Sequence, residues 1–370
     1  MSSVRDEEDR RYMMRALRLA QRGRGTTSPN PTVGAVVVRN RRIVGEGWHC
    51  RPGLDHAEVM ALSQAGARAR GATMYVTLEP CAHTGRTPPC VDALVRSGIQ
   101  RCVVAVRDPH AIVNGRGLRG LKRSGMKVEV GLCAAESRKT LGGYWLVHTR
   151  GRPRVTWKVA ATLDGKIADG QRRSRWITGA ESRRHGHRLR AEADAVVIGS
   201  GTARADDPRL TARGVNARRQ PLRVVCDTQL RLPLSLRLFR PVLARGTVVA
   251  CGTSVPAHRV RALEARGATV WRLPLRGGGV SPLALARRLA TRGCHEVLLE
   301  SGPGLGTAWL RAGVVDRIAL FMAPRVLGAE GLSWCGSLGR RHLARALEGR
   351  IAGRGAFGSD AFLLVEVGGH

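Results

Sequence analysis

Apolar positions recur at helical and strand spacing, in alternation, through the first 149 residues. Between residues 6 and 22, apolar positions from Tyr12 to Ala20 interrupt the charged ones, and this stripe predicts an amphipathic helix. The same spacing predicts helices at 56–66, 90–97, 116–124 and 134–147. Short apolar runs predict strands at 33–38, 43–48, 73–78, 101–106 and 127–130. This alternation predicts a sheet covered by helices on both faces.

The pattern begins again after Gly151-Arg152-Pro153, a plausible linker, so we predict two α/β domains with a boundary near residue 149, at 1–149 and 150–370. Strands are predicted at 155–161, 194–200, 222–226, 247–250, 269–273, 296–300, 316–322 and 361–367. Helices are predicted at 180–192, 256–266, 281–292 and from the glycine-rich 301–306 segment to about 312. A loop is expected at 204–211, and residues 330–360 are uninformative.

The charge is large but changes this picture little. The formal net charge is +34, and only five of the 62 basic residues are lysines. The arginines are spread along the chain without a long block, which favours a coding preference for arginine over a nucleic-acid surface. Aromatic residues make up 4% of the chain and do not interleave with the basic ones, as base stacking would need. The charge should still attract anions, including a phosphorylated substrate and a dinucleotide.

Two further classes of protein are disfavoured by composition. No apolar run approaches 18 residues, so we expect no membrane-spanning helix. The charged N-terminus lacks the apolar region of a secretory signal. Nine scattered cysteines, an odd number, form no disulfide framework and predict reduced thiols and a cytoplasmic location.

One stretch carries recognisable chemistry: His56-Ala57-Glu58, then Glu79-Pro80-Cys81, then Cys90. One imidazole and two thiols are a ligand set for zinc that leaves one position open for water. Zinc makes such a water acidic, and Glu58, in the first turn of a helix, can move its proton without binding the metal. This is the composition of a zinc deaminase. Cys90 near a helix N-terminus is expected to favour the thiolate.

Simpler interpretations explain less of this stretch. A histidine or a cysteine taken alone is more often a core residue than a metal ligand. A structural zinc site more often has four protein ligands and needs no neighbouring glutamate. The coincidence of the three motifs in order favours a catalytic zinc.

The motifs HAEV at 56–59, TLEPCAH at 77–83 and GRTPPC at 85–90 resemble the deaminase half of the bifunctional riboflavin-biosynthesis deaminase/reductase family. SPNPTVGA at 28–35 is similar to the substrate loop of that family, which implies that Asn30 binds substrate. The resemblance implies a cytidine-deaminase-like α/β/α fold with one Zn²⁺ per chain. Eight residues separate Cys81 from Cys90, whereas nucleic-acid deaminases typically show P-C-x-x-C.

VAATLDGKIA, SRWITG, HRLRAEADAVVIGSGTARADDPRLT and LLESGPGLG resemble the reductase half of the same family, which implies a dihydrofolate-reductase-like α/β domain that uses NADPH. Glycine-rich turns alone would be a weak signal, since most are plain connectors. The resemblance implies cofactor contacts at Ala160, Trp176, Thr202, Asp206, Gly302, Pro303, Gly304, Leu305, Gly306 and Thr307. It implies substrate contacts at Ser174, Arg190, Leu210, Arg213 and Glu300. Lys158, Asp164 and Arg209 are further candidates.

Some positions depart from the family pattern. His110-Ala111 stands where Asn-Pro is usual, and Arg172-Arg173 replaces Gly-Glu before Ser174, which puts the local charge of the reductase site in doubt. His185-Gly186-His187 has metal-like spacing, but residues i and i+2 do not face each other on a helix, so we interpret it as no metal site.

We therefore predict a bifunctional enzyme whose first domain deaminates a phosphoribosylated diaminopyrimidinone and whose second reduces the ribosyl group with NADPH. The expected partner is this small phosphorylated pyrimidine, with no specific nucleic acid and no membrane. A deaminase with a degenerate reductase domain and a nucleic-acid deaminase stay open as alternatives. Whether the chain forms a homo-oligomer is left open by the sequence.

Overall fold

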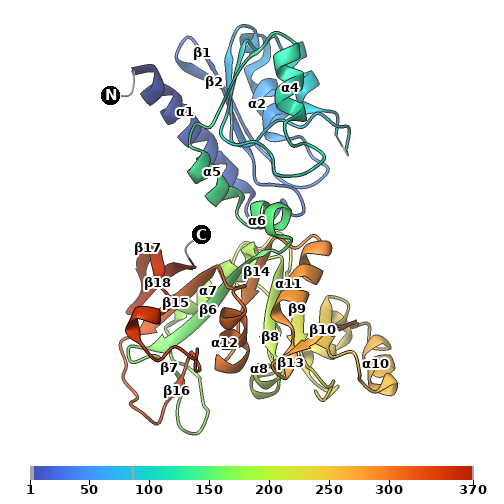
Figure 1. The fold of residues 1–370 in the computed structure, drawn as a ribbon, viewed down its shortest axis with the longest axis vertical. Coiled ribbons are helices and arrows are strands. Elements are labelled where there is room, and N and C mark those ends of the chain that lie inside the picture. Colours follow the sequence, from blue (N-terminus) through green and yellow to red (C-terminus); the bar gives the residue numbers. More distant parts are fainter. Residues whose placement is uncertain (1–3, 86, 369–370) are drawn as a thin grey trace. The chain divides into compact units, whose positions relative to one another are not determined.

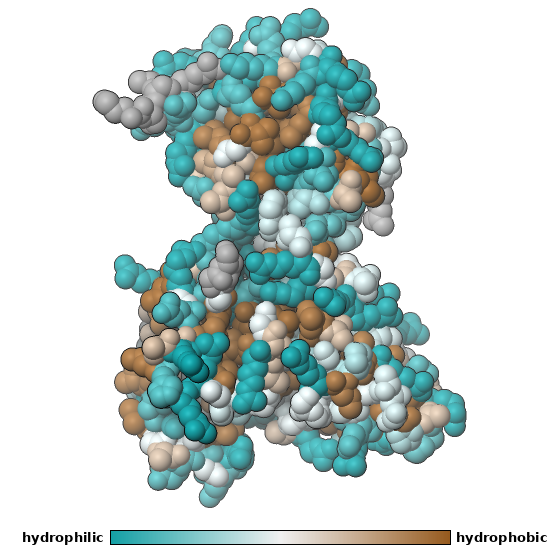
Figure 2. All heavy atoms as spheres, viewed as in Figure 1, coloured by the Kyte–Doolittle hydropathy of each residue, from teal (hydrophilic) through white to brown (hydrophobic). Residues whose placement is uncertain are grey.

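The computed structural model describes residues 4–85 and 87–368, which form two compact units (Figure 1). The units are Met1–Gly151 and Arg152–His370, so the division lies two residues beyond the predicted boundary. On the face shown in Figure 2, hydrophilic residues are interspersed with hydrophobic ones over both units. Within the described residues, no helix is long and apolar enough to cross a membrane.

A five-stranded sheet of order β2-β1-β3-β4-β5 forms the centre of the N-terminal unit. Its strands are β1 (Gly34–Arg39), β2 (Arg42–Trp48), β3 (Thr73–Val76), β4 (Arg101–Val104) and β5 (Lys127–Val130). β1 and β2 form an antiparallel hairpin, whose turn residues Asn40 and Arg41 have positive φ angles. β1 also pairs antiparallel with β3, and β3, β4 and β5 run parallel. Parallel strands therefore bring the segments after β3 and β4 to the same edge of the sheet.

Helices cover both faces of this sheet, as predicted. They are α1 (Val4–Ala20), α2 (Ala57–Ala65), α3 (Cys90–Arg96), α4 (Arg116–Arg123), α5 (Ala134–Leu141) and α6 (Gly143–Arg150), with 3₁₀ turns at Gln21–Gly23 and Gly66–Ala69. α2, α3 and α4 pack on one core, which contains Val37, Met74 and Val104. α1 packs on the other face against Val36, Tyr75 and Val103. The unit is thus an α/β/α sandwich.

The single helix predicted at 134–147 is wrong. Gly142 has a φ of 53° and divides this segment into α5 and α6. A glycine tolerates this backbone conformation at low cost, so the chain can end one helix and begin the next within a single residue.

The C-terminal unit contains a nine-stranded sheet of order β11-β10-β9-β8-β14-β6-β15-β18-β17. Its strands are β6 (Arg154–Thr162), β8 (Ala195–Gly199), β9 (Leu222–Cys226), β10 (Thr247–Cys251), β11 (Thr269–Arg272), β14 (Glu296–Leu299), β15 (Arg317–Ala323), β17 (Gly349–Phe357) and β18 (Asp360–Val367). Two small ladders pair β12 (Leu275–Arg276) with β13 (Gly279–Val280) and β16 (Leu332–Ser333) with β7 (Lys166–Ala168). All main-sheet pairs from β11 to β15 are parallel, and β18 and β17 add an antiparallel edge. Ligands bind such sheets outside the carboxyl ends of the parallel strands.

The helices of this unit are α7 (Ala180–Glu192), α8 (Ser200–Asp206), α9 (Pro241–Ala244), α10 (Ala257–Glu264), α11 (Pro282–Thr291) and α12 (Pro303–Arg311), with 3₁₀ turns at Arg237–Phe239 and Leu343–Arg345. The loop predicted from residue 204 is wrong in its first part. Gly199 ends β8, and α8 follows at once and runs to Asp206, so the loop begins only after that residue. β17 was missed altogether: it is a mostly exposed edge strand rich in glycine, so it has no apolar alternation to read.

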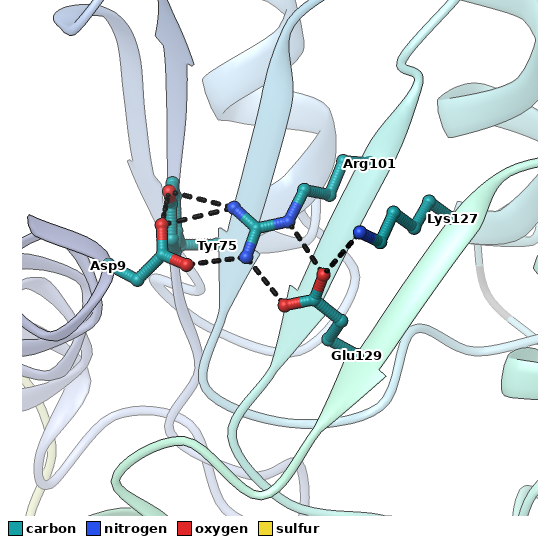
Figure 3. A network of polar contacts seen from close by, with 5 residues as sticks. All are labelled: Asp9, Tyr75, Arg101, Lys127 and Glu129. Carbon is teal, nitrogen blue, oxygen red and sulfur yellow. Dashed lines mark hydrogen bonds and ion pairs between the residues drawn. The ribbon is translucent and has the colours of Figure 1, made fainter. Parts of the chain in front are cut away.

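A buried polar network connects α1 to the sheet of the N-terminal unit (Figure 3). The Arg101 guanidinium, on β4, donates from Nη1 to Asp9 Oδ1 at 3.0 Å and from Nε to Glu129 Oε1 at 3.1 Å. Tyr75 on β3 also donates to Asp9. Arg101 and Asp9 are 9% and 8% exposed, so this ion pair lies largely out of water.

Candidate functional site

Three predicted metal ligands meet in the N-terminal unit. His56 is the N-cap residue of α2, Cys90 opens α3, and Cys81 lies in the loop between β3 and α3. Their ligand atoms all lie within 4.8 Å of one another. His56 Nδ1 is 3.2 Å from Cys90 Sγ and 3.6 Å from Cys81 Sγ, so Nδ1 is the nitrogen that faces the thiols. One nitrogen and two sulfurs at this spacing fit a zinc ion and leave room for a further ligand.

The two thiols differ in acidity, and not as the sequence predicted. A hydrogen bond from the Cys90 thiol lowers the pKa of Cys81 to about 4, assisted by His56. The same contact and burial raise the pKa of Cys90. Cys90 does open a helix, but its close neighbour Cys81 carries the negative charge first, and two adjacent thiolates repel each other.

Glu58 lies beside this cluster, in the first turn of α2, and is 3% exposed. Burial raises its pKa to about 7, against the opposing effect of His56. α2 lies close to β2 because of Gly47, where a Cβ would come within 2.2 Å of the Ala57 carbonyl oxygen. A carboxyl group with a pKa near neutrality is suited to accept and return a proton.

The predicted substrate residue Asn30 is held by a residue that the sequence did not indicate. Asn30 Nδ2 is 3.0 Å from His49 Nε2, and His49 Nδ1 is 3.2 Å from the Asp55 carbonyl oxygen. If Nδ1 carries the proton, Nε2 accepts from the Asn30 amide N–H, and this bond holds the Asn30 amide in one orientation. The His49 ring also meets the His56 ring edge-on at 5.1 Å. No motif marked His49, since its role depends on a fold contact.

Glu79 has a structural role that its motif did not reveal. Its carboxylate is 3% exposed and accepts hydrogen bonds from four backbone N–H groups, those of Asp108, Gly115, Gly117 and Leu118, at 2.9–3.2 Å. These bonds connect the loop before Cys81 to the loop after β4 and to the first turn of α4. Glu79 therefore organises one wall of the cluster.

In the C-terminal unit, a predicted residue on α7 meets one directly after β14, at the carboxyl end of the parallel sheet. Arg190 donates to Glu300 through Nε at 2.5 Å and through Nη2 at 2.8 Å. Burial alone would raise the pKa of Glu300, but Arg190 and Lys158 lower it to about 2. Burial lowers the pKa of Lys158, while Glu300 acts in the opposite direction. Arg190 is thus paired with Glu300, while Lys158 is a second, half-buried cation near this pair that can attract an anion.

The remaining predicted substrate residues lie on two loops. Arg213 Nη1 donates to Thr211 Oγ1 at 2.9 Å, and burial, together with Arg190 and Arg209, lowers its pKa. Ser174 lies half-buried in the loop before α7. Leu210 is only 1% exposed and packs in the core, so its backbone and not its side chain can face a ligand.

The glycine-rich 301–306 segment forms the start of α12, with Gly302 as N-cap residue. A Cβ at Gly302 or Gly304 would meet nothing within 4 Å, whereas a Cβ at Gly306 would lie 2.0 Å from the Trp157 ring. Leu305 packs against Gly199, and the Thr307 hydroxyl accepts from the Gly336 N–H at 2.8 Å. Only part of the segment is therefore open to a cofactor, and Gly306 is needed for packing.

The other predicted cofactor residues surround the same strand ends. Ala160 lies on β6, Thr202 and Asp206 lie on α8, and the Trp176 ring is 62% exposed. The Arg183 guanidinium lies 4.5 Å from the Trp176 ring centroid. An exposed indole beside a cation offers a stacking surface to a planar group.

Comparison with known proteins assigns each unit. Residues 6–106 match the family described as cytidine and deoxycytidylate deaminase zinc-binding region, and residues 153–361 match the RibD C-terminal domain. A riboflavin biosynthesis protein RibD from Aquifex aeolicus is 44% identical over 344 residues, which cover 93% of this chain and 94% of the relative. One from Escherichia coli is 39% identical over 355 residues, covering 92% and 94%. The chain belongs to the RibD family.

Solved RibD structures agree with the fold. Acinetobacter baumannii RibD has a TM-score of 0.88 at 34% identity and covers 98% of this chain and 100% of its own. A Thermotoga maritima protein described as a diaminohydroxyphosphoribosylaminopyrimidine deaminase/5-amino-6-(5-phosphoribosylamino)uracil reductase has a TM-score of 0.82 at 31% identity, covering 98% and 99%. This chain is therefore a bifunctional riboflavin-biosynthesis enzyme, with a zinc-binding deaminase unit and a reductase unit that has a dihydrofolate-reductase-like fold.

Two departures from the RibD pattern can be placed. Arg173 pairs with Asp169 through Nε at 2.8 Å, so its charge is compensated, and Arg172 is exposed with a φ of 64°. His110 Nδ1 accepts from the Ile112 N–H at 3.1 Å, which leaves its Nε2 as the proton-bearing nitrogen. Its ring lies 4.3 Å from that of His148.

Proposed function

We propose that His56, Cys81 and Cys90 hold one Zn²⁺ ion per chain and that the N-terminal unit deaminates 2,5-diamino-6-(5-phosphoribosylamino)pyrimidin-4-one. The observation that carries this proposal is the convergence of three ligand atoms within 4.8 Å beside a buried glutamate. Zn²⁺ acts as a Lewis acid that makes water a nucleophile at neutral pH. The Thermotoga maritima relative is described as a deaminase of this substrate.

The residues of the chain then divide the remaining tasks. Glu58 takes a proton from the attacking water and delivers it to the leaving amine, so that one water enters and one ammonia leaves. The Asn30 amide oxygen, oriented by His49, accepts a hydrogen bond from the substrate. Burial around Glu58 keeps bulk water from competing for these hydrogen bonds.

For the C-terminal unit we propose NADPH as the hydride donor and the ribosyl group of the deaminated product as the acceptor. NADPH supplies the hydride, and the protein supplies binding and orientation. Gly302 and Gly304 let the backbone approach the cofactor pyrophosphate, and Trp176 offers a stacking surface. Arg190 and Arg213 bind the substrate phosphate, and Lys158 and Glu300 lie close enough to interact with Arg190.

A single incubation tests both halves. The purified protein is given the diaminopyrimidinone substrate with and without NADPH, and products are identified by mass. We expect the deaminated product without NADPH and the ribityl product with it, in a preparation that holds about one zinc per chain. Full deamination by metal-free protein would contradict the zinc assignment. Deamination without reduction would revive the degenerate-reductase alternative.

We infer that the specific partner is the small phosphorylated pyrimidine, with no specific nucleic acid and no membrane, and that the chain works in the cytoplasm. All nine cysteines are free, which suits a reducing compartment.

A further inference from the structure

The His185-Gly186-His187 sequence on α7 places two imidazoles on different sides of the helix. The His185 ring stacks on Phe357 with centroids 4.3 Å apart, and Phe321 and Phe362 complete an aromatic cluster around it. His187 faces the loop that follows α8, where its Nδ1 is 3.2 Å from the Arg213 N–H. The two histidines therefore have separate environments.

We propose that His187 is a positioning residue of the reductase substrate pocket: it accepts the Arg213 N–H and thereby fixes the Arg213 guanidinium for binding a phosphate. The inference rests on the function proposed for the C-terminal unit and deepens it.

The backbone of the loop from Thr211 to Arg213 is held by side chains at every residue. Arg190 Nη1 donates to the Thr211 carbonyl oxygen at 3.2 Å. Gln220 accepts from the Ala212 N–H at 2.8 Å and donates to the Ala212 carbonyl oxygen at 3.0 Å. The third residue of the loop, Arg213, donates its backbone N–H to His187. This bond therefore holds the backbone of the residue whose guanidinium is to bind the phosphate.

The chemistry of His187 suits this task. Only the neutral imidazole can accept a hydrogen bond. Burial lowers the pKa of His187, and Arg190 and Arg213 lower it further, against Glu300 and a hydrogen bond with the Thr211 backbone. A neutral acceptor adds no charge to a pocket in which Arg190, Arg209 and Arg213 already interact. An acidic side chain here would instead compete with the phosphate.

The test compares His187→Leu, which removes the acceptor, with His187→Asn, whose Oδ1 can take the place of Nδ1. His185→Leu, two residues away on α7, is the matched control. For each full-length variant we would measure kcat, KM for the deaminated phosphorylated substrate, KM for NADPH and inhibition of the reductase by inorganic phosphate, together with the thermal unfolding midpoint.

We expect His187→Leu to raise KM for the substrate and the inhibition constant of inorganic phosphate about five- to tenfold, the loss of roughly one hydrogen bond, with kcat and KM for NADPH within twofold of wild type. His187→Asn should restore both constants to within about twofold. His185→Leu should change neither.

Equal substrate KM in His187→Leu and wild type would overturn the inference. So would an effect of His187→Leu that His187→Asn does not relieve, because a purely structural role would affect both. If the wild type reduces nothing, the proposed function fails by itself, and inorganic phosphate binding, followed by its effect on thermal unfolding, still tests His187. If inorganic phosphate does not change the thermal unfolding of wild type either, both the function proposed for the C-terminal unit and the role of His187 are overturned.

Discussion

Two glutamates, one buried and one partly buried, show how local surroundings determine the use of the same residue. His56 offsets only part of the effect of burial on Glu58, and the pKa of Glu58 rises to about 7. Glu300 is paired with Arg190 through two hydrogen bonds, and its pKa falls to about 2. The first is suited to proton transfer and the second to holding a fixed charge.

Replacing Glu58 by glutamine removes the proton carrier but no proposed metal ligand. We expect Glu58→Gln to keep its zinc and to lose deaminase activity by about 10² or more. Metal content and single-turnover deamination measure the two effects, with Cys90→Ser as the control that should lose both. Loss of zinc from Glu58→Gln would show that Glu58 is a ligand.

The Glu300–Arg190 pair should make the C-terminal unit sensitive to acid. Because the pKa of Glu300 is lowered from 4.5 to about 2 on folding, its contribution is complete above about pH 5 and is lost as the pH falls toward 2. Glu300→Gln should therefore be less stable than wild type at pH 7, and the difference should shrink below pH 4. Urea unfolding of full-length protein across this range measures it; a constant difference would contradict the assignment.

At the scale of elements, the start of α12 combines a ligand surface and a packing surface in four residues. Gly304→Ala meets nothing within 4 Å, so it should fold normally and raise KM for NADPH about tenfold, because the methyl group occupies space beside the backbone N–H groups. Gly306→Ala meets the Trp157 ring and should cost about 1–3 kcal/mol of stability. Thermal unfolding and NADPH kinetics separate the two; equal stability of both variants would contradict this division.

The Arg101 network holds α1 against the sheet of the N-terminal unit (Figure 3). Arg101→Met leaves the buried Asp9 carboxylate without its cation, and we expect a loss of about 3 kcal/mol in the free energy of unfolding. Lys127 contacts Glu129 at 3.3 Å but is 61% exposed, so Lys127→Ala should cost less than about 0.5 kcal/mol. Similar losses in both variants, measured by urea unfolding, would show that burial does not govern this network.

At the scale of the whole molecule, the two candidate sites use separate residue sets in separate units. Glu58→Gln should therefore leave NADPH-dependent reduction of supplied deaminated substrate intact, and Asp206→Ala should slow reduction while deamination continues. Asp206 lies at the end of α8 and acts on the charge of Lys158. Single-turnover NADPH oxidation measures the effect; a wild-type rate in Asp206→Ala would remove this residue from the cofactor site.

The sequence alone determined the two α/β units and the identity of the zinc motifs. Strong apolar periodicity depends on local spacing, which is why β5 and β9 were predicted with the bounds that they have. The motifs around His56, Cys81 and Cys90 are short and contiguous, so they can be read without a fold. The glycine break at residue 142 and the exposed strand β17 carry no such periodicity and were missed.

Only the tertiary structure decided what depends on contacts between distant segments. It placed His49 against Asn30 and gave Glu79 four backbone donors. It also showed that the thiol with the lowered pKa is Cys81, where the sequence had predicted Cys90. It also buried the side chain of Leu210, a residue for which the family resemblance implied a substrate contact. Burial and hydrogen bonding are properties of the neighbours that a residue meets after folding, and the order of residues along the chain does not contain them locally.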